Sequence, residues 1–287
     1  MTLFENSVDR LLFLLCAAMI FVPLEQILPR LKHKKILRAD LKLDLAYMLV
    51  GATLTMLVSV VFITLVVGAL DDHIPAFIQS QVRSQPLWAQ VIMLIILGDF
   101  YYYWMHRLFH RVPFLWKFHA VHHSIEELDW IAAYRTHPVD TAITNSGVLI
   151  LALLLDVSAA ALAIFSVQFS WHSLLKHSNV KVGWAPLRWV FVTPTFHHWH
   201  HANDAEAFDK NFAGQFPMWD LLFGTAIRNQ SDGPAAYGVD DPVPRTFLRS
   251  LAYPFAASMP VPVPVKQQVG ETPGFEPPAC GVTDRQG

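Results

Sequence analysis

An uninterrupted apolar stretch constrains this chain more than any other feature of its sequence. Residues 45–70 contain no charged side chain, and the stretch is longer than the roughly 20 apolar residues that a helix needs to cross a bilayer. Hydrophobic residues make up 53% of the chain and charged residues only 15%, which is too apolar for an ordinary soluble domain. We therefore expect an all-α integral membrane protein.

Three further segments are apolar enough to enter the bilayer. Residues 11–28 form one candidate span, and residues 85–98 form another that ends directly before Asp99. Residues 141–175 contain a single acidic residue, Asp156, and their length suits two short spans joined by a turn, a re-entrant hairpin, or one long helix. We favour the hairpin. The expected architecture is about four transmembrane helices in two hairpins, with a helical cap that carries the histidines.

The loops between the spans predict the orientation of the chain. The loop before residue 45 is rich in basic residues: Arg30, Lys32, Lys34, Lys35, Arg38 and Lys42. The next loop, residues 71–86, has two acidic residues and one basic residue, Arg83. Because short basic loops stay in the cytoplasm, the third span should return there. The histidine-rich cap is therefore expected on the cytoplasmic face.

Histidine spacing is the strongest functional signal in the sequence. Nine of the fourteen histidines lie in residues 101–110, 118–123 and 196–201. Side chains three or four residues apart share one face of a helix, which defines three histidine boxes. They are the first box (His106, His110), the second box (His119, His122, His123) and the third box (His197, His200, His201). His198 falls outside the arc of the third box, so we do not expect it to be a ligand.

Two more histidines and one acid are candidates for the same site. His177 precedes a predicted helix break and is expected to be a ligand, and His137 is a further candidate. His172 lies about 140° around a helix from His177 and should not share its ligand face. Asp99 lies on nearly the same stripe as the first box, where its carboxylate could orient an imidazole by accepting the second N–H.

The number of imidazoles predicts two metal ions. The three boxes offer eight, more than the three or four ligands of one zinc. With only Cys16 and Cys280 in the chain, neither a disulfide framework nor thiolate ligation is expected. All-histidine ligation with open positions suits iron that binds O₂, although the spacing also allows zinc or manganese.

The boxes and their flanking residues resemble the fatty acid hydroxylase and sterol desaturase superfamily of integral membrane di-iron enzymes. The similar flanking segments are Asp99-Phe-Tyr-Tyr-Tyr-Trp-Met-His-Arg107, Arg135-Thr-His-Pro138, His177-Ser-Asn179 and Trp219-Asp-Leu-Leu-Phe-Gly-Thr225. The resemblance covers about residues 95–226 and places Asn179 beside the ligands. Two departures stand out: Asp140 replaces a frequent Glu, and Asn211-Phe-Ala-Gly214 carries an inserted alanine.

The resemblance implies a function. A pair of iron ions would activate O₂ to hydroxylate, or to desaturate, a lipid or sterol-like substrate. Electrons would come from a partner such as a ferredoxin or a small cytochrome, because the sequence has no haem-attachment, dinucleotide or iron–sulfur motif. The net charge of −2 gives no basic face for nucleic acid.

The histidine pattern also allows other classes of protein. A membrane haem or metal-binding electron-transfer protein is the main alternative, but adjacent histidines on one helix face do not suit a haem that takes one ligand from each of two helices. A transporter would place its ligands within the spans, and a metal-dependent hydrolase would work without O₂. The expected segments are membrane spans with the basic loop (1–90), a fatty acid hydroxylase-like catalytic domain (91–230), a C-terminal extension (231–260) and a Pro-rich disordered tail (261–287).

Overall fold

The computed structural model describes residues 7–32, 34–181, 185–228 and 233–256. Throughout these residues the ordered elements are helices, and the only β-type pairs are two isolated bridges, Pro29 with Val180 and Ala202 with Tyr237. The predicted all-α class is confirmed. The predicted tail, residues 261–287, lies outside the described residues.

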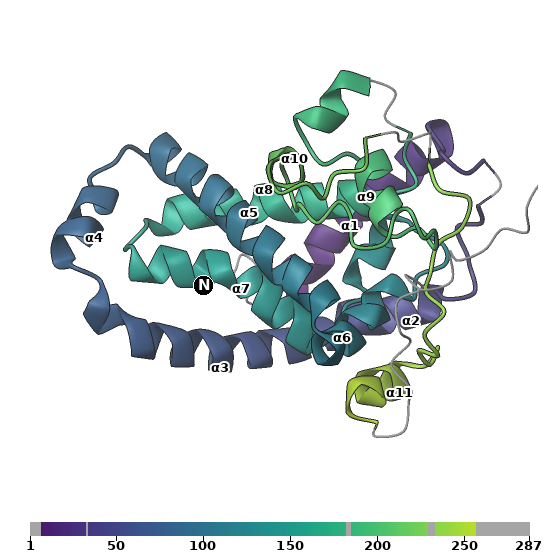
Figure 1. The fold of residues 1–287 in the computed structure, drawn as a ribbon, viewed down its shortest axis with the longest axis horizontal. Coiled ribbons are helices and arrows are strands. Elements are labelled where there is room, and N and C mark those ends of the chain that lie inside the picture. Colours follow the sequence, from purple (N-terminus) through teal and green to yellow (C-terminus); the bar gives the residue numbers. More distant parts are fainter. Residues whose placement is uncertain (1–6, 33, 182–184, 229–232, 257–287) are drawn as a thin grey trace, which may run out of the picture.

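Long helices make up one part of the molecule (Figure 1). The helices up to the first box are α1 (Ser7–Ile27), α2 (Leu41–Ala46), a π-helical turn (Tyr47–Gly51), α3 (Ala52–Leu70), a 3₁₀ turn (Asp71–His73), α4 (Ala76–Arg83) and α5 (Leu87–Arg111). Within the residues that the structure describes, two stretches are long and apolar enough to cross a membrane, Leu41–His73 and Leu87–Arg111. None of the residues of α3 is fully buried, as expected of a helix that faces lipid on much of its surface.

Residues 141–175 form two helices rather than one. α7 (Pro138–Leu154) and α8 (Ala159–His177) are joined by a short turn, in which Asp156 has a φ of 56°. Ser158 caps α8 by accepting a hydrogen bond from the N–H of Ala161. The helical break excludes the single long helix among the predicted alternatives.

Small residues let these helices pack closely. α7 packs against both α3 and α5, and α5 also packs against α8. At the α5–α7 contact a Cβ on Gly98 would lie 2.1 Å from Val148, and one on Gly147 would lie 2.1 Å from the ring of Tyr101. Close approach at glycine is a usual device of membrane helix pairs.

Shorter helices gather at one end of this bundle and form the cap (Figure 1). They are α6 (Pro113–His123), α9 (Pro194–His200), α10 (Met218–Leu222) and α11 (Phe247–Ala252), with 3₁₀ turns at Trp130–Tyr134, Ala185–Trp189 and Tyr253–Phe255. α6 and α9 each begin with a proline, which suits the first helical position because its missing N–H has no partner there. The Thr193 hydroxyl caps α9 by accepting from the N–H of Phe196.

The basic loop is tied to the cap through buried ion pairs. Arg38 donates to Asp129 at 2.7 Å and also pairs with Asp44. Arg135 pairs with Asp44 as well, and donates to Asp40 at 3.1 Å. Because an unpaired charge is costly in the interior, these pairs fix the loop and the start of α2 against the segment that precedes α7.

Candidate metal centre

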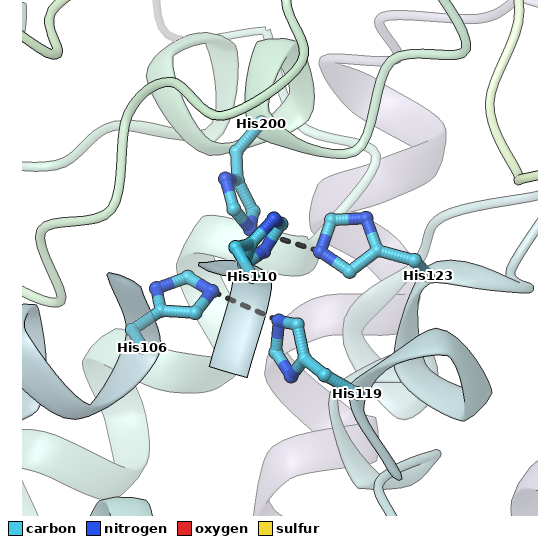
Figure 2. A group of neighbouring side chains, drawn as sticks. All are labelled: His106, His110, His119, His123 and His200. Atoms are coloured by element: carbon cyan, nitrogen blue, oxygen red, sulfur yellow. Dashed lines mark hydrogen bonds between the residues drawn. The ribbon is translucent and has the colours of Figure 1, made fainter. Parts of the chain in front are cut away.

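The structure brings nine of the ten predicted ligands together in two groups. Group A consists of His106, His110, His119, His123 and His200, and group B of His122, His177, His197 and His201. Within each group the ligand nitrogens all lie within 4.8 Å of one another. Figure 2 shows the imidazoles of group A pointing toward a common centre from α5, α6 and α9.

The second and third boxes are each divided between the two groups. On α6, His119 and His123 face group A while His122 faces group B. The third box splits in the same way, since His200 belongs to group A and its other two histidines to group B. The rings of His123 and His201 stack with centroids 4.6 Å apart, so the two groups are in direct contact.

Hydrogen bonds fix the tautomer of five of the nine imidazoles. The Nδ1 of each lies beside an acceptor: His106 at 2.7 Å from the Phe212 carbonyl, His119 at 2.7 Å from Asp140, His122 at 3.0 Å from the Arg135 carbonyl, His177 at 2.7 Å from the Ser173 carbonyl and His200 at 2.7 Å from the Lys210 carbonyl. A carbonyl or carboxylate oxygen has no hydrogen to donate, so Nδ1 must carry it. The Nε2 atom of a neutral ring then presents a lone pair.

These lone pairs face one another at short range. The Nε2 atoms of His106 and His119 are 2.9 Å apart, and those of His122 and His177 are 3.2 Å apart. Both rings of each pair hold their hydrogen on Nδ1, so neither Nε2 can donate and the two lone pairs would repel each other. Two nitrogens each bound at about 2.1 Å to one ion at a right angle lie about 3.0 Å apart. The donor sets therefore fit metal ions.

The lowered pKa values of His123, His200 and His201 keep these three rings neutral. Burial, opposed by the hydrogen bond to the Lys210 carbonyl, lowers the pKa of His200 to about 3. Burial, followed by repulsion from neighbouring imidazoles, holds the pKa values of His123 and His201 well below 6.5. A neutral imidazole is the form that binds a metal, so these ligands are ready at neutral pH.

His137, the tenth predicted ligand, lies outside both groups. Its Nδ1 accepts from the N–H of Val139 at 3.2 Å, which caps α7, and its Nε2 lies 3.1 Å from the carbonyl of Leu251. Both ring nitrogens are therefore engaged by backbone groups. As predicted for a residue outside the arc, His198 also lies outside both groups, with its Nδ1 2.9 Å from the hydroxyl of Tyr237.

The two residues predicted to stand beside the ligands have other contacts. Asp99 accepts from the backbone N–H groups of Gly214, Gln215 and Phe216 at 2.8–3.0 Å instead of from an imidazole. Asn179 exchanges hydrogen bonds with the backbone of Leu31. Both residues thus hold loops of the cap in place rather than orient a ring directly.

Sequence reasoning missed the carboxylate that does orient a ligand. Asp140 contacts His119, and both side chains are almost fully buried. In the sequence analysis Asp140 is only a departure from the family pattern. Its position in the first helical turn after the Arg-Thr-His-Pro segment is the sequence feature that could have indicated its contact with a histidine.

An apolar cavity of about 490 Å³ extends to residues that contact the histidines. Residues of α1, α3, α5, α7 and α8 line it. At its cap end Tyr102 packs its ring 5.3 Å from that of His106, and Ser173 supplies the carbonyl that contacts His177. The cavity thus reaches residues that touch group A and group B.

Comparisons with known proteins agree with this geometry. The family model described as fatty acid hydroxylase matches residues 91–225, which include every histidine of both groups. An ornithine lipid hydroxylase of Rhizobium tropici is 32% identical over 171 residues, which cover 60% of this chain and 52% of that protein. The alkylglycerol monooxygenase of Xenopus tropicalis is 30% identical (63% and 39% covered), and methylsterol monooxygenase 1 of Rattus norvegicus is 30% identical (51% and 50% covered).

These matches span about half the length of the relatives, or less. No solved structure matches the chain significantly. The matched region nevertheless contains the whole candidate metal centre, and the family model and the relatives point to the superfamily that the histidine boxes resemble. Residues 91–225, which carry both histidine groups, are therefore similar to the fatty acid hydroxylase family.

Proposed function

We propose that this protein is a membrane-bound, non-haem di-iron oxygenase that hydroxylates a lipid. The observation that carries the proposal is the convergence of nine imidazoles in two adjacent groups, next to residues that line an apolar cavity. Relatives named as ornithine lipid, alkylglycerol and methylsterol oxygenases support a lipid or sterol-like substrate. Desaturation of the same substrate is the alternative outcome.

Group A would hold one iron and group B the other. When bound, the iron pair would supply the activation of O₂ that is needed to remove hydrogen from an unactivated C–H bond. The balanced reaction is RH + O₂ + 2 e⁻ + 2 H⁺ → ROH + H₂O. The two electrons would come from a partner such as a ferredoxin or a small cytochrome.

The protein's own residues orient the imidazole rings and exclude bulk water from the candidate metal centre. Asp140 and the four carbonyls hold five rings so that each Nε2 points inward. The four residues of group B are at most 5% exposed, so bulk water is largely excluded from that side. Exclusion of water protects a strong oxidant from side reactions. The cavity would guide a lipid tail to the same place.

The membrane arrangement is part of the proposal. α3 and α5 would cross the bilayer, and α1 and the α7–α8 pair would complete about four spans in two hairpins. The cap would face the cytoplasm. The absence of buried residues on α3 and the basic loop before it support this arrangement, since an apolar helix surface needs lipid and short basic loops stay inside.

Metal analysis with product analysis tests the proposal. Full-length protein purified from membranes should contain about two irons per chain, identified by Mössbauer spectroscopy, and His119→Ala should contain fewer. With O₂ and a reductant, membrane lipids should gain one oxygen atom; loss of two hydrogens would indicate desaturation instead. Zinc in the preparation calls for iron reconstitution before assay. An iron-supplemented, folded protein that binds no metal would refute the proposal.

A further inference from the structure

One polar side chain stands out on the wall of the cavity. Asn145 lies on α7 between Thr141 and Leu149, four residues to either side, and all three line the cavity. The residue is exposed, and no described residue makes a hydrogen bond to its amide. A polar group without a partner is costly at membrane depth. A bound ligand could therefore supply the hydrogen-bond partner that the Asn145 amide lacks among the described residues.

The neighbouring helix α3 contributes hydroxyl groups to the cavity as well. Thr55 and Ser59, one turn apart on α3, line the same cavity, and α3 packs along α7. In contrast, the Ser166 hydroxyl on α8 already donates to the Leu162 carbonyl at 2.8 Å. Asn145 is thus the residue of this wall with the largest unused capacity, since an amide can both donate and accept.

The position of Asn145 relative to the histidines is set by α7. Asp140 contacts His119, and Asn145 follows it by five residues, about 7.5 Å along the helix axis. Along α8 the cavity runs from Leu162 to Leu174, about 18 Å, which is comparable with the roughly 15 Å of one leaflet's hydrocarbon. A lipid tail therefore fits, with Asn145 near the histidine end.

We propose that Asn145 determines specificity by hydrogen bonding to an oxygen of the bound lipid, of the hydroxyl, ester or ether type. The ligand is then an amphipathic lipid whose oxygen lies a few carbons from the position presented to the histidines. A plain hydrocarbon segment leaves the amide unpaired and is disfavoured. The inference rests on the proposed function in that the bound lipid is taken to be the substrate.

Binding is tested first, without reference to activity. The melting temperature of the detergent-solubilised full-length protein is measured with 1-octadecanol or with octadecane at equal concentration. The alcohol should raise the melting temperature of the wild type more than the alkane does, because a ligand that binds the folded state stabilises it. Asn145→Leu should lose this difference, whereas Ser166→Ala should keep it. Equal differences in the wild type and Asn145→Leu overturn the inference, and Asn145→Ala serves if the leucine variant does not fold.

Product formation then separates the two proposals. Lipid extracts of cells that make each variant are compared by mass spectrometry, with iron per chain measured in parallel. Asn145→Leu should form about 5- to 100-fold less product at unchanged iron, and Ser166→Ala should stay within about twofold of the wild type. Wild-type product levels in Asn145→Leu overturn the inference and leave the proposed function standing. If the wild type forms no more product than His119→Ala, the proposed function fails, and the melting temperatures decide the role of Asn145.

Discussion

The contact between Asp140 and His119 offers the sharpest test of the metal centre. The carboxylate oxygen lies 2.7 Å from Nδ1, and the two side chains are 3% and 4% exposed. Asp140→Asn keeps the size and shape of the side chain, and its amide oxygen can still accept from Nδ1–H. The substitution removes the negative charge. In the wild type this charge makes the imidazole a stronger donor to a metal. The fold should therefore survive while metal binding weakens.

The expected loss is about 10- to 100-fold in the iron affinity of group A, which corresponds to about 1.4 to 2.7 kcal/mol. Metal-free protein is titrated with Fe(II) under anaerobic conditions, and the iron retained per chain is measured after dialysis. Iron should fall from about two per chain toward one, because Asp140 contacts no ligand of group B among the described residues.

Asp209→Asn is the matched control. Asp209 lies 3.7 Å from Nδ1 of His110 and is 31% exposed, so solvent weakens its effect and iron affinity should change by less than about threefold. Wild-type affinity in Asp140→Asn, or an equal loss in Asp209→Asn, would contradict the argument that a buried charge-assisted hydrogen bond tunes the ligand.

Three further predictions test the ligand set, the helix packing and the protonation state. His137→Gln should keep its iron while His177→Gln loses it, because backbone groups engage both nitrogens of His137; equal iron loss would refute the assignment. Gly147→Ala should lower the melting temperature by several degrees, because its Cβ would lie 2.1 Å from the ring of Tyr101, whereas a Cβ on Gly68 meets nothing within 4 Å; equal melting temperatures of Gly147→Ala and Gly68→Ala would refute the packing. Metal-free protein should lose stability as the pH falls below about 6.5. The pKa values of His123, His200 and His201 lie well below 6.5 in the folded protein, so below that pH the unfolded chain binds protons that these three folded rings do not accept. The slope should reach about 1.4 kcal/mol per pH unit for each such histidine, and a melting temperature that is constant between pH 7.5 and 5 would refute it.

The sequence predicts the helices well where the signal is local. The length of the apolar stretch at residues 45–70 is enough to predict α3. The break between α7 and α8 is marked by Ser158, a helix-capping residue, and by Asp156, whose positive φ is tolerated by a short polar side chain. Which of the predicted alternatives forms therefore depends on two turn residues inside an otherwise apolar segment.

The structure brings nine of the ten candidate ligands together, but the sequence does not predict how they are divided between the two groups. Helical phase brings His119 and His123 to one face and lets His122 point elsewhere. Phase alone does not say which neighbouring helix each face meets. That depends on the packing of α9 against the end of α8, which brings His177 beside His197, with their Nε2 atoms 2.9 Å apart. The boxes are therefore units of sequence, whereas the two groups result from tertiary packing.

The acceptors that orient the ligands explain why Asp99 was assigned the wrong contact. Four of the five are backbone carbonyls, which leave no trace in the sequence, and two of these belong to the loop at residues 210–216. Asp99 holds the second half of this loop, and Asp220 holds its first half by accepting from the N–H groups of Phe212 and Ala213. Ala213, the alanine inserted relative to the family pattern, is therefore held by the hydrogen bond from its N–H to Asp220. Asp99, an acid on the histidine stripe, thus holds one half of the loop whose other half supplies the Lys210 and Phe212 carbonyls to His200 and His106.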